Sequence, residues 1–528
     1  MSCFGIALAF VSLVISSVVA NGQIAGLSDV DTLVVCPEVF QTTLQPWLDY
    51  RRKQGHSIQV IVPPDSAAAL SARIKQEAAK SNLKSVLLVG DAGTEIFQVP
   101  VDYQKAKVNI FFGSEPDIAT DNTFADLNGD QIPELAIGRL TVDTNEELSS
   151  MIDRIIAYEN SADFSDWRRR INVVAGVGGF DPMTDKIIEQ STSRLINHHI
   201  PQGYPFSMTY GSWSSPYCPA PEKFGETSID KFNEGCLFWV YVGHGSRHRL
   251  DSVFTPKGRY EILNVKNVQL LECRAGSPIA IMLCCYSGAF DDPVDCLAEN
   301  MLVQPKGPIS VLCGNRVTMP YAMSLLSLEL MDEHFHGDSN TLGQLMLRAK
   351  QRLVDPRESL TSTREMRDEI EKIGSLFNPK PELVQDEIYE HLALFQLLGD
   401  PLLRIARPQE ITLMAKLEEG LSTTVEIAGQ MPFDGELILE VCYARSRFRE
   451  RPMFRNESKL KKDSNQAMHD DYLKHQNTVC TKRVDRVKAG EFVTRLELPV
   501  DASGELTVRG FLRSQESHAI GAQTILLR

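Results

Sequence analysis

Two unbroken apolar runs between Leu237 and Phe290 constrain the fold of this chain more than any other feature. The first reads LFWVYV and continues into GHGS, and the second reads IAIML and continues into CCYSGAF. Apolar runs of strand length without polar alternation are typical of strands buried on both faces, as in a parallel sheet covered by helices. The sequence therefore predicts two parallel strands near the centre of an α/β sheet.

The residues that end these two runs are chemically reactive. His244 follows the first run and Cys285 ends the second. Functional groups in open α/β sheets collect at the carboxyl ends of strands, so the imidazole and the thiol are expected to share one crevice. A thiol becomes a useful nucleophile when a base lies beside it. The alternative is a buried core cysteine and a turn histidine, which is the usual interpretation of a lone cysteine.

Short apolar runs alternate with helix-forming segments from Thr32 onward, which predicts a doubly wound parallel sheet. We expect strands at Leu33–Val35, Ser57–Val62, Lys84–Val89, Val108–Phe112, Leu135–Ile137, Ile171–Ala175 and Pro308–Cys313. The expected helices are Thr42–Lys53, Ala67–Lys80, Thr144–Glu159, Ala322–His334, Leu342–Val354 and Leu383–Leu398.

The glycine-rich turn GVGGFDP follows one of the predicted strands and raises the possibility of dinucleotide binding. Its glycines, Gly176, Gly178 and Gly179, lack the G-x-G-x-x-G fingerprint, which argues against a nucleotide-dependent oxidoreductase. The turn also places Asp181 just past a strand end of the same sheet. Its carboxylate could orient the imidazole of His244 or receive a basic substrate side chain, and it could equally cap the next helix.

An acidic loop, DLNGDQIPE, has the composition of a calcium site. Asp126, Asn128 and Asp130 alternate along it, and Glu134 follows four residues later. Carboxylate and amide oxygens that converge on one point are the ligands that Ca²⁺ prefers, although the loop is shorter than an EF-hand loop. We expect a structural Ca²⁺ here. The alternative is a solvated turn ahead of the next strand.

Glycines beside the reactive pair would let backbone amides approach a substrate carbonyl. The amides of Cys285 and Gly245 are the expected oxyanion hole. The loop GNRVTMPYA follows the predicted strand Pro308–Cys313 at the same sheet edge. We expect this loop to form a wall of the substrate pocket.

The two ends of the chain differ in character from its middle. Residues 1–20 are apolar and end in small residues, which predicts a signal peptide cleaved after Ala20; an uncleaved anchor is the alternative. From Glu410 to Arg528, short β-type runs separated by turns predict a sandwich. The polar insertion Arg445–Lys474 is expected to be a flexible solvated loop, and Cys442 and Cys480, which flank it, are a plausible disulfide pair.

Five segments in order resemble the gingipain family of cysteine peptidases, family C25 in the caspase-like clan. They are TFADLNGDQIPELAIGRL, TNEELSSMIDRIIAYE, VYVGHGS, CCYSGAFDDPVDCLAENM and LFQLLGDPLLRI, and the resemblance covers about Asp31 to Ile405. It implies a caspase-like α/β catalytic region of two subdomains, an immunoglobulin-like β-sandwich behind it, calcium dependence and export. The expected division is a signal peptide at 1–20, subdomains at 21–160 and 161–405, and the β domain at 406–528.

The resemblance also assigns roles by position. The clan's His-Gly pair falls on His244 and Gly245, and its nucleophile falls on Cys285 rather than Cys284. The C-x-x-G-x-F continuation, formed by Cys285, Gly288 and Phe290, fixes that choice. The family's upstream acid would fall near Asp181. Compared with the best-known members, we expect the chain to lack the long propeptide and the haemagglutinin extension.

Together these features predict a secreted or periplasmic cysteine endopeptidase that forms a thioester acyl-enzyme on Cys285. The net charge of −15 argues against nucleic acid and weakly favours substrates with a basic residue before the cleaved bond. Protein or peptide substrates, no membrane span after signal cleavage, and a monomer are expected. The alternative is a catalytically inactive relative that serves as a surface binding module or in secretion.

Overall fold

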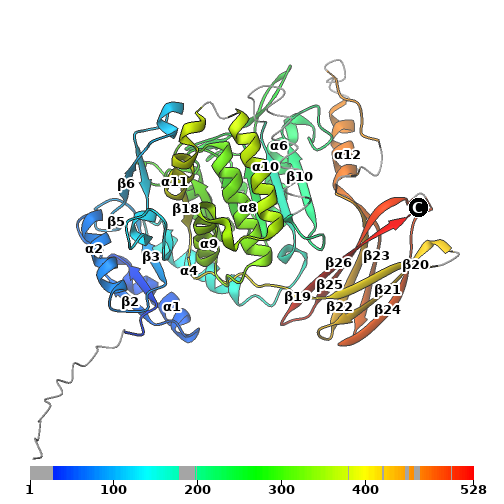
Figure 1. Cartoon of the computed structure of the whole chain (residues 1–528), viewed down its shortest axis with the longest axis horizontal. Helices are drawn as coiled ribbons and strands as arrows, with labels where there is room; N and C mark the ends of the chain where they lie inside the picture. The colour runs from blue at the N-terminus through cyan, green and yellow to red at the C-terminus, as the bar shows by residue number, and fades with distance from the viewer. Residues whose placement is uncertain are drawn as a thin grey trace, which may run out of the picture.

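A ten-stranded sheet forms the centre of the molecule in the computed structural model (Figure 1), which describes residues 28–177, 197, 199–377, 380–418, 421–445, 447, 451–456, 464–500 and 502–527. The strand order is β10-β9-β11-β16-β17-β18-β8-β3-β1-β2. In chain order the strands are β1 Thr32–Val35, β2 Ile58–Ile61, β3 Ser85–Val89, β8 Ala136–Leu140, β9 Ile171–Ala175, β10 Phe206–Tyr210, β11 Phe238–Val242, β16 Ile279–Leu283, β17 Ser310–Gly314 and β18 Phe395–Leu398.

The sheet is mostly parallel, but its two halves run in opposite directions. β10, β9, β11, β16 and β17 are mutually parallel, whereas β18 is antiparallel to β17 and parallel to β8. The carboxyl ends of β11, β16 and β17 therefore lie at the same sheet edge as the amino end of β8. The sheet continues without a break through the subdomain boundary predicted near residue 160.

The prediction of one helix over Leu383–Leu398 is wrong at its end. Helix α11 covers Val384–Leu394, and Phe395–Leu398 form strand β18. All four residues of β18 are buried. An apolar run that directly follows a helix has the same pattern as a last helical turn, but here it forms the strand between β17 and β8.

Helices cover both faces of the sheet. The side chains of β1 alternate between two hydrophobic clusters, with Val34 in one and Leu33 and Val35 in the other, so neither face is exposed there. The helices are α1 Glu38–Lys53, α2 Ala67–Ala78, α3 Asn122–Ala125, α4 Asn145–Glu159, α6 Phe224–Asn233, α7 Leu297–Leu302, α8 Pro320–His336, α9 Leu342–Val354 and α10 Thr361–Phe377. Helix α4 begins with a capping box formed by Thr144 and Glu147.

The strand predicted over Val108–Phe112 is instead the 3₁₀ helix η1, Asn109–Phe112, between strands β6 (Asp102–Lys105) and β7 (Asp117–Thr120). The Glu390 carboxylate of α11 accepts the backbone N–H groups of residues 107, 108 and 109 at 2.8, 2.7 and 2.8 Å. Because these N–H groups bond to one carboxylate, they do not form the hydrogen bonds of a β-ladder with a neighbouring strand. Gly113, with a φ of 86°, ends the turn in the left-handed region.

The C-terminal region contains a five-stranded sheet, β19-β26-β25-β22-β23, and a three-stranded sheet, β20-β21-β24. One hydrophobic cluster includes Val425 from the smaller sheet and Leu439 from the larger one. The strands are β19 Gln409–Glu410, β20 Thr412–Glu418, β21 Leu421–Met431, β22 Gly435–Tyr443, β23 Val479–Val487, β24 Gly490–Glu497, β25 Gly504–Arg513 and β26 His518–Leu527. Whether this region is immunoglobulin-like stays a prediction.

The insertion between β22 and β23 is not the solvated loop predicted for Arg445–Lys474. It contains helix α12, Ser464–Gln476, which rises beside β10 in Figure 1. Tyr472 of α12 is fully buried, and its hydroxyl lies 2.8 Å from the Thr209 hydroxyl of β10. The Gln476 side-chain amide also bonds to the backbone of Met208, so α12 covers the edge strand β10. The insertion is polar on average, but buried residues such as Tyr472 hold its helix against the rest of the protein.

The flanking cysteines Cys442 and Cys480 form no disulfide with each other in the structure, so the pairing predicted from the sequence is wrong. Residue Cys442 lies opposite Val479 across a β-bulge between β22 and β23. The irregularity shifts the register there, so Cys442 does not pair directly with Cys480 in the ladder.

Candidate active site

His244 and Cys285 leave the central sheet at the same level of neighbouring strands. Val242 of β11 pairs with Leu283 of β16, and His244 and Cys285 each lie two residues beyond this pair. Adjacent strands lie about 4.8 Å apart, so the two loops start side by side. A Cβ atom on Gly245 would lie 2.6 Å from the carbonyl oxygen of Cys285. Glycine therefore permits a close approach between the two loops that any side chain would block.

The two adjacent cysteines occupy different environments. Cys284 is 1% exposed, and burial raises the pKa of its thiol, which disfavours the thiolate. Cys285 is partly exposed, and its sulfur accepts the backbone N–H of Thr318 at 3.3 Å. A backbone donor stabilises negative charge on sulfur. Of the two thiols, Cys285 is the one suited to nucleophilic attack.

Thr318 was not singled out from the sequence, although its loop was. It lies in GNRVTMPYA after β17, and its hydroxyl oxygen is 3.6 Å from the Cys285 sulfur. The next residue is held by a buried histidine, because the Met319 N–H donates to His391 at 3.0 Å. Burial lowers the pKa of His391 to about 4, so its ring stays neutral and can accept this bond. Only the strand order, which places β17 beside β16, identifies this contact.

The turn that carries His244 is held by the buried side chain of Tyr241. The hydroxyl of Tyr241 donates to the His244 carbonyl oxygen at 2.8 Å and accepts the Asp251 N–H at 3.2 Å. Tyr241 is fully buried, whereas His244 is exposed. The imidazole therefore projects from a rigid base. His248, four residues later, is an exposed loop residue.

The backbone directly after Cys285 is strained. Tyr286 has a φ of 58°, a left-handed conformation that bulky residues rarely adopt. Its N–H donates to the Arg316 carbonyl at 3.1 Å, which ties the turn to the loop after β17. Strained residues persist only where neighbouring contacts hold them, and they cluster at functional sites.

Asp181, like Gly178 and Gly179, lies outside the described residues. Another carboxylate, Asp251, is found at this edge. A Cβ atom on Gly176, at the end of β9, would lie 3.3 Å from its Oδ2 atom. Within the part of the chain that the structure describes, no cation is paired with Asp251. Sequence reasoning missed this residue because its position depends on the short hairpin of β12 (Gly245–Ser246) and β13 (Arg249–Leu250).

The acidic loop before β8 brings its carboxylates together. Ligand oxygens of Asp126, Asp130 and Glu134 lie within 4.8 Å of one another. The side-chain amide of Asn128 donates to Asp130 at 3.1 Å and to Glu134 at 2.5 Å, so it lies among them. The three carboxylates form a hard-oxygen donor set, which fits Ca²⁺.

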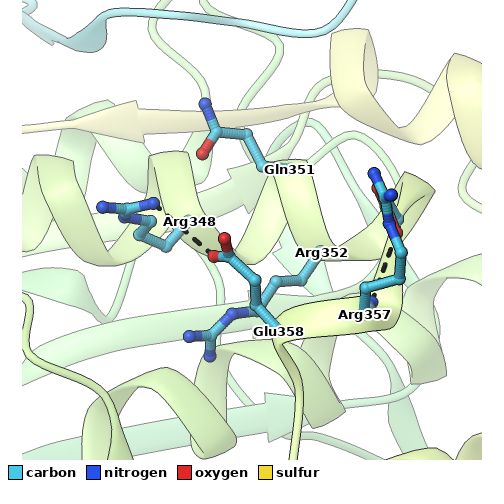
Figure 2. Close-up of a pocket in the computed structure, with 6 residues that line it drawn as sticks. Arg348, Gln351, Arg352, Arg357 and Glu358 are labelled. Carbon is cyan, nitrogen blue, oxygen red and sulfur yellow. Dashed lines mark hydrogen bonds and ion pairs between the residues drawn. The ribbon is translucent and has the colours of Figure 1, made fainter.

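Figure 2 shows a cavity of about 480 Å³ beside the carboxyl end of α9. Its charged groups are paired with one another or with neighbours: Arg348 with Glu358 at 3.7 Å, and Arg352 with Glu333 at 2.9 Å. Neither His244 nor Cys285 lines it. The reactive groups therefore lie at the sheet edge, away from this cavity. The lining residues are Arg348, Gln351, Arg352, Asp355, Arg357 and Glu358.

Several proteins of known sequence are similar to this chain, and they are gingipains. Gingipain R2 of Porphyromonas gingivalis (strain ATCC BAA-308 / W83) is 24% identical over 315 residues, which cover 57% of this chain and 39% of the relative. A Lys-gingipain of P. gingivalis is 24% identical over 287 residues, covering 52% of this chain and 15% of that protein. The chain thus spans less than half the length of these relatives.

Solved structures show the same fold. The crystal structure of the Arg-specific cysteine proteinase gingipain R (RGPB) matches with a TM-score of 0.53 at 17% identity, over 94% of this chain and 97% of that one. The complex of the P. gingivalis RgpB pro- and mature domains matches with a TM-score of 0.51 at 18% identity, over 94% and 100%. Among the described helices, none is both long enough and apolar enough to cross a membrane.

The family model for peptidase family C25 matches residues 26–406, which include both reactive loops and the acidic loop. This match covers most of the chain and agrees with the resemblance drawn from the five sequence segments. The mostly parallel sheet and the gingipain-like fold are consistent with it. The chain belongs to peptidase family C25, a family of cysteine peptidases.

Proposed function

We propose that this protein is a cysteine endopeptidase in which Cys285 and His244 form the catalytic pair. The observation that carries the proposal is their shared register, two residues beyond the Val242–Leu283 pair on adjacent parallel strands. In the proposed reaction, His244 accepts the thiol proton and the thiolate attacks a peptide carbonyl. The protonated His244 then gives its proton to the leaving amine, which leaves a thioester on Cys285. Water hydrolyses the thioester and regenerates the thiol.

Backbone donors would stabilise the charged species of this reaction. The Thr318 N–H, 3.3 Å from the Cys285 sulfur, supports the thiolate. We assign the oxyanion to the amides of Cys285 and Gly245, because the two loops approach closely at Gly245. Each donor belongs to the backbone, so it is in place before the substrate binds.

The proposed substrates are proteins or peptides with a basic residue before the cleaved bond. The carboxylate of Asp251 supports this, since it stands at the carboxyl end of β9 and no cation of the described chain is paired with it. Asp181 is a second candidate, and the net charge of −15 favours approach of cationic substrates. As in the sequence-based prediction, we propose an exported monomer.

We also propose that Asp126, Asn128, Asp130 and Glu134 hold a structural Ca²⁺. The ion would neutralise three carboxylates whose oxygens lie within 4.8 Å and would cross-link the loop before β8. Buried Asp126 already accepts the N–H groups of Gly129 and Gln131 at 2.6 and 2.9 Å, so the loop is shaped without the ion.

The test of the proposed peptidase is a pair of cysteine variants assayed on an unstructured protein and on peptides with basic residues. Cys285→Ala should lower cleavage by at least ~10³-fold without changing the thermal unfolding temperature, because nucleophile loss removes the chemical step. Cys284→Ala is the matched control and should retain most activity. Cleavage that survives in Cys285→Ala would exclude Cys285 as the nucleophile.

A further inference from the structure

One carboxylate contacts all three loops that surround the Cys285 sulfur. The loops after β11, β16 and β17 carry His244, Cys285 and Thr318, and each holds a second residue that reaches Glu115. These partners are Arg247, Tyr286 and Arg316. We propose that Glu115 is a positioning residue that holds the two reactive groups in register. This inference rests on the proposed peptidase function, and it concerns a residue outside the catalytic loops.

The contacts on Glu115 are specific to its two oxygens. Arg247 forms an ion pair with Oε1, and the Tyr286 hydroxyl donates to Oε2 at 2.6 Å. Arg316 lies 3.7 Å from Oε2. The guanidinium of Arg247 also stacks over the Tyr286 ring, 4.5 Å from its centroid. Glu115 therefore joins the loop of His244 to the residue that directly follows Cys285.

The strained turn at Tyr286 explains why such a clamp matters. With a φ of 58°, Tyr286 has a conformation that persists only where neighbouring contacts hold it, and its relaxation would move the adjacent Cys285. Its hydroxyl bond to Glu115 and its stacking with Arg247 hold the side chain from two sides. Small displacements of a reacting atom can cost about 100-fold in rate.

Glu115 itself stands on a braced support, in the connection between η1 and β7. The backbone before η1 is held by the three N–H bonds to the buried Glu390 carboxylate. The strand that follows Glu115 docks on the loop after β17, where Arg316 donates to the Asp117 carbonyl at 3.1 Å. The backbone on both sides of Glu115 is therefore held in place, so its carboxylate can fix the positions of Arg247 and Tyr286 in the two loops.

The electrostatics fit an ionised clamp. Partial burial opposes ionisation of Glu115, but the hydrogen bonds from Tyr286 and Arg247 outweigh it and lower the pKa of the carboxyl below its usual value. The carboxylate is therefore charged near neutral pH. Replacing it with an amide would remove the ion pair with Arg247 while preserving size.

The test compares Glu115→Gln and Glu115→Ala with Asp117→Asn. Asp117 is a matched control, since it lies two residues away and is similarly exposed, and its side chain pairs with Lys105. The change to Asn leaves its backbone bond with Arg316 in place. For both Glu115 variants we expect kcat to fall ~10-fold or more with KM within about twofold, and unfolding temperatures close to that of Asp117→Asn. Glu115→Asp should recover part of the loss. Unchanged kcat, or an equal loss in Asp117→Asn, would overturn the inference.

A second readout separates this inference from the proposed function. The rate at which iodoacetamide alkylates Cys285 should fall, and its pH profile should shift, in Glu115→Gln but not in Asp117→Asn. If the wild-type protein cleaves no peptide, the proposed function fails, and the alkylation ratio still decides the role of Glu115. Equal alkylation profiles in wild type and Glu115→Gln would refute that role.

Discussion

The two ends of the strands around β9, β11 and β16 are built for different purposes. At the carboxyl ends, His244 is exposed, Cys285 is partly exposed and Tyr286 is strained. At the amino end of β9, Arg169 is 1% exposed, and its guanidinium contacts Glu440 of β22 at 3.3 Å. One end keeps reactive groups open to a substrate, whereas the other buries charges to attach the C-terminal region. Activity and stability should therefore be separable in this molecule.

The amino-end contact is a closed network of charges and rings. Glu440 also pairs with Arg509 at 2.8 Å and with Lys482 at 3.2 Å, and Arg169 lies over the Phe511 ring at 4.4 Å. Ile438, Phe511 and Ile520 of the C-terminal sheet join the hydrophobic cluster of the catalytic region. The five-stranded sheet therefore packs through one of its faces on the region that contains the ten-stranded sheet.

The largest expected effect would come from His244→Ala, which removes the proposed base at the carboxyl end. We expect kcat to fall by at least ~10³-fold, about 4 kcal/mol of transition-state stabilisation, with unchanged unfolding. Steady-state kinetics and thermal denaturation measure the two quantities. His248→Ala is the matched control, because His248 is an exposed loop residue. A similar loss in both variants would mean that the loop, and not the imidazole of His244, is required.

The reciprocal effect is expected from Glu440→Gln at the amino end. Burial opposes ionisation of Glu440, but Arg509, Arg169 and Lys482 outweigh it and lower its pKa to about 2 from an ordinary 4.5. A lowered carboxyl pKa stabilises the fold above the unfolded-state pKa. This stabilisation, about 3 kcal/mol, is lost as the pH falls from about 4.5 towards 2. The variant should be destabilised by about that amount at pH 7, with kcat within twofold of wild type.

Glu436→Gln provides the comparison for Glu440. Glu436 lies on the same strand, but its pair with Arg513 is about one-third exposed, and such pairs contribute less than about 1 kcal/mol. Chemical denaturation of both variants between pH 3 and pH 7 measures the difference. Equal destabilisation of the two would show that the buried network does not carry the attachment.

Calcium removal tests a third region, the acidic loop before β8. This loop lies at the same sheet edge as His244 and Cys285, but its carboxylates accept hydrogen bonds from backbone N–H groups and from the Asn128 amide. If the free Ca²⁺ concentration is about 100 times the dissociation constant of the site, chelation should lower the free energy of unfolding by about 2.7 kcal/mol. Thermal unfolding with and without EGTA measures this effect, and Asp130→Asn should abolish it. An EGTA effect of equal size in Asp130→Asn would place any bound ion elsewhere.

The smallest expected effect concerns substrate choice at the carboxyl end of β9. Asp251→Asn should lower kcat/KM by ~10-fold for peptides with Arg or Lys before the cleaved bond, because one charge pair is lost. Peptides with an uncharged residue there should be unaffected. Glu261→Gln, which alters an exposed acid of the neighbouring hairpin, should change neither class. Equal losses for charged and uncharged peptides would argue that Asp251 has only a structural role.

The sequence was most informative where a single local pattern was enough to predict an element or the family. Apolar runs predicted β11 and β16, and the capping box at Thr144 predicted the start of α4. The family was also recognisable, because five motifs occur in order. These signals are local, so neither the strand order nor the distant contacts were needed.

The errors arose where distant residues decide the local structure. Segment η1 is a 3₁₀ helix because the Glu390 carboxylate, more than 270 residues later, accepts the backbone N–H groups at its start. Phe395–Leu398 form a strand because they lie between β17 and β8. Helix α12 is ordered through Tyr472, whose partner Thr209 is far away in the sequence. In the site, Thr318 and Glu115 were missed for the same reason, whereas Asp251 was missed because a short hairpin sets its position.

The most direct test of the central claim is the reactivity of Cys285 in the intact protein. We would treat the protein with limiting iodoacetamide near pH 7, with and without calcium, and map the modified cysteines by mass spectrometry. The account predicts selective modification of Cys285, which slows to the rate of an ordinary exposed thiol in His244→Ala. Modification of Cys285 that is no faster than that of Cys480, or is unchanged in His244→Ala, would contradict an activated nucleophile.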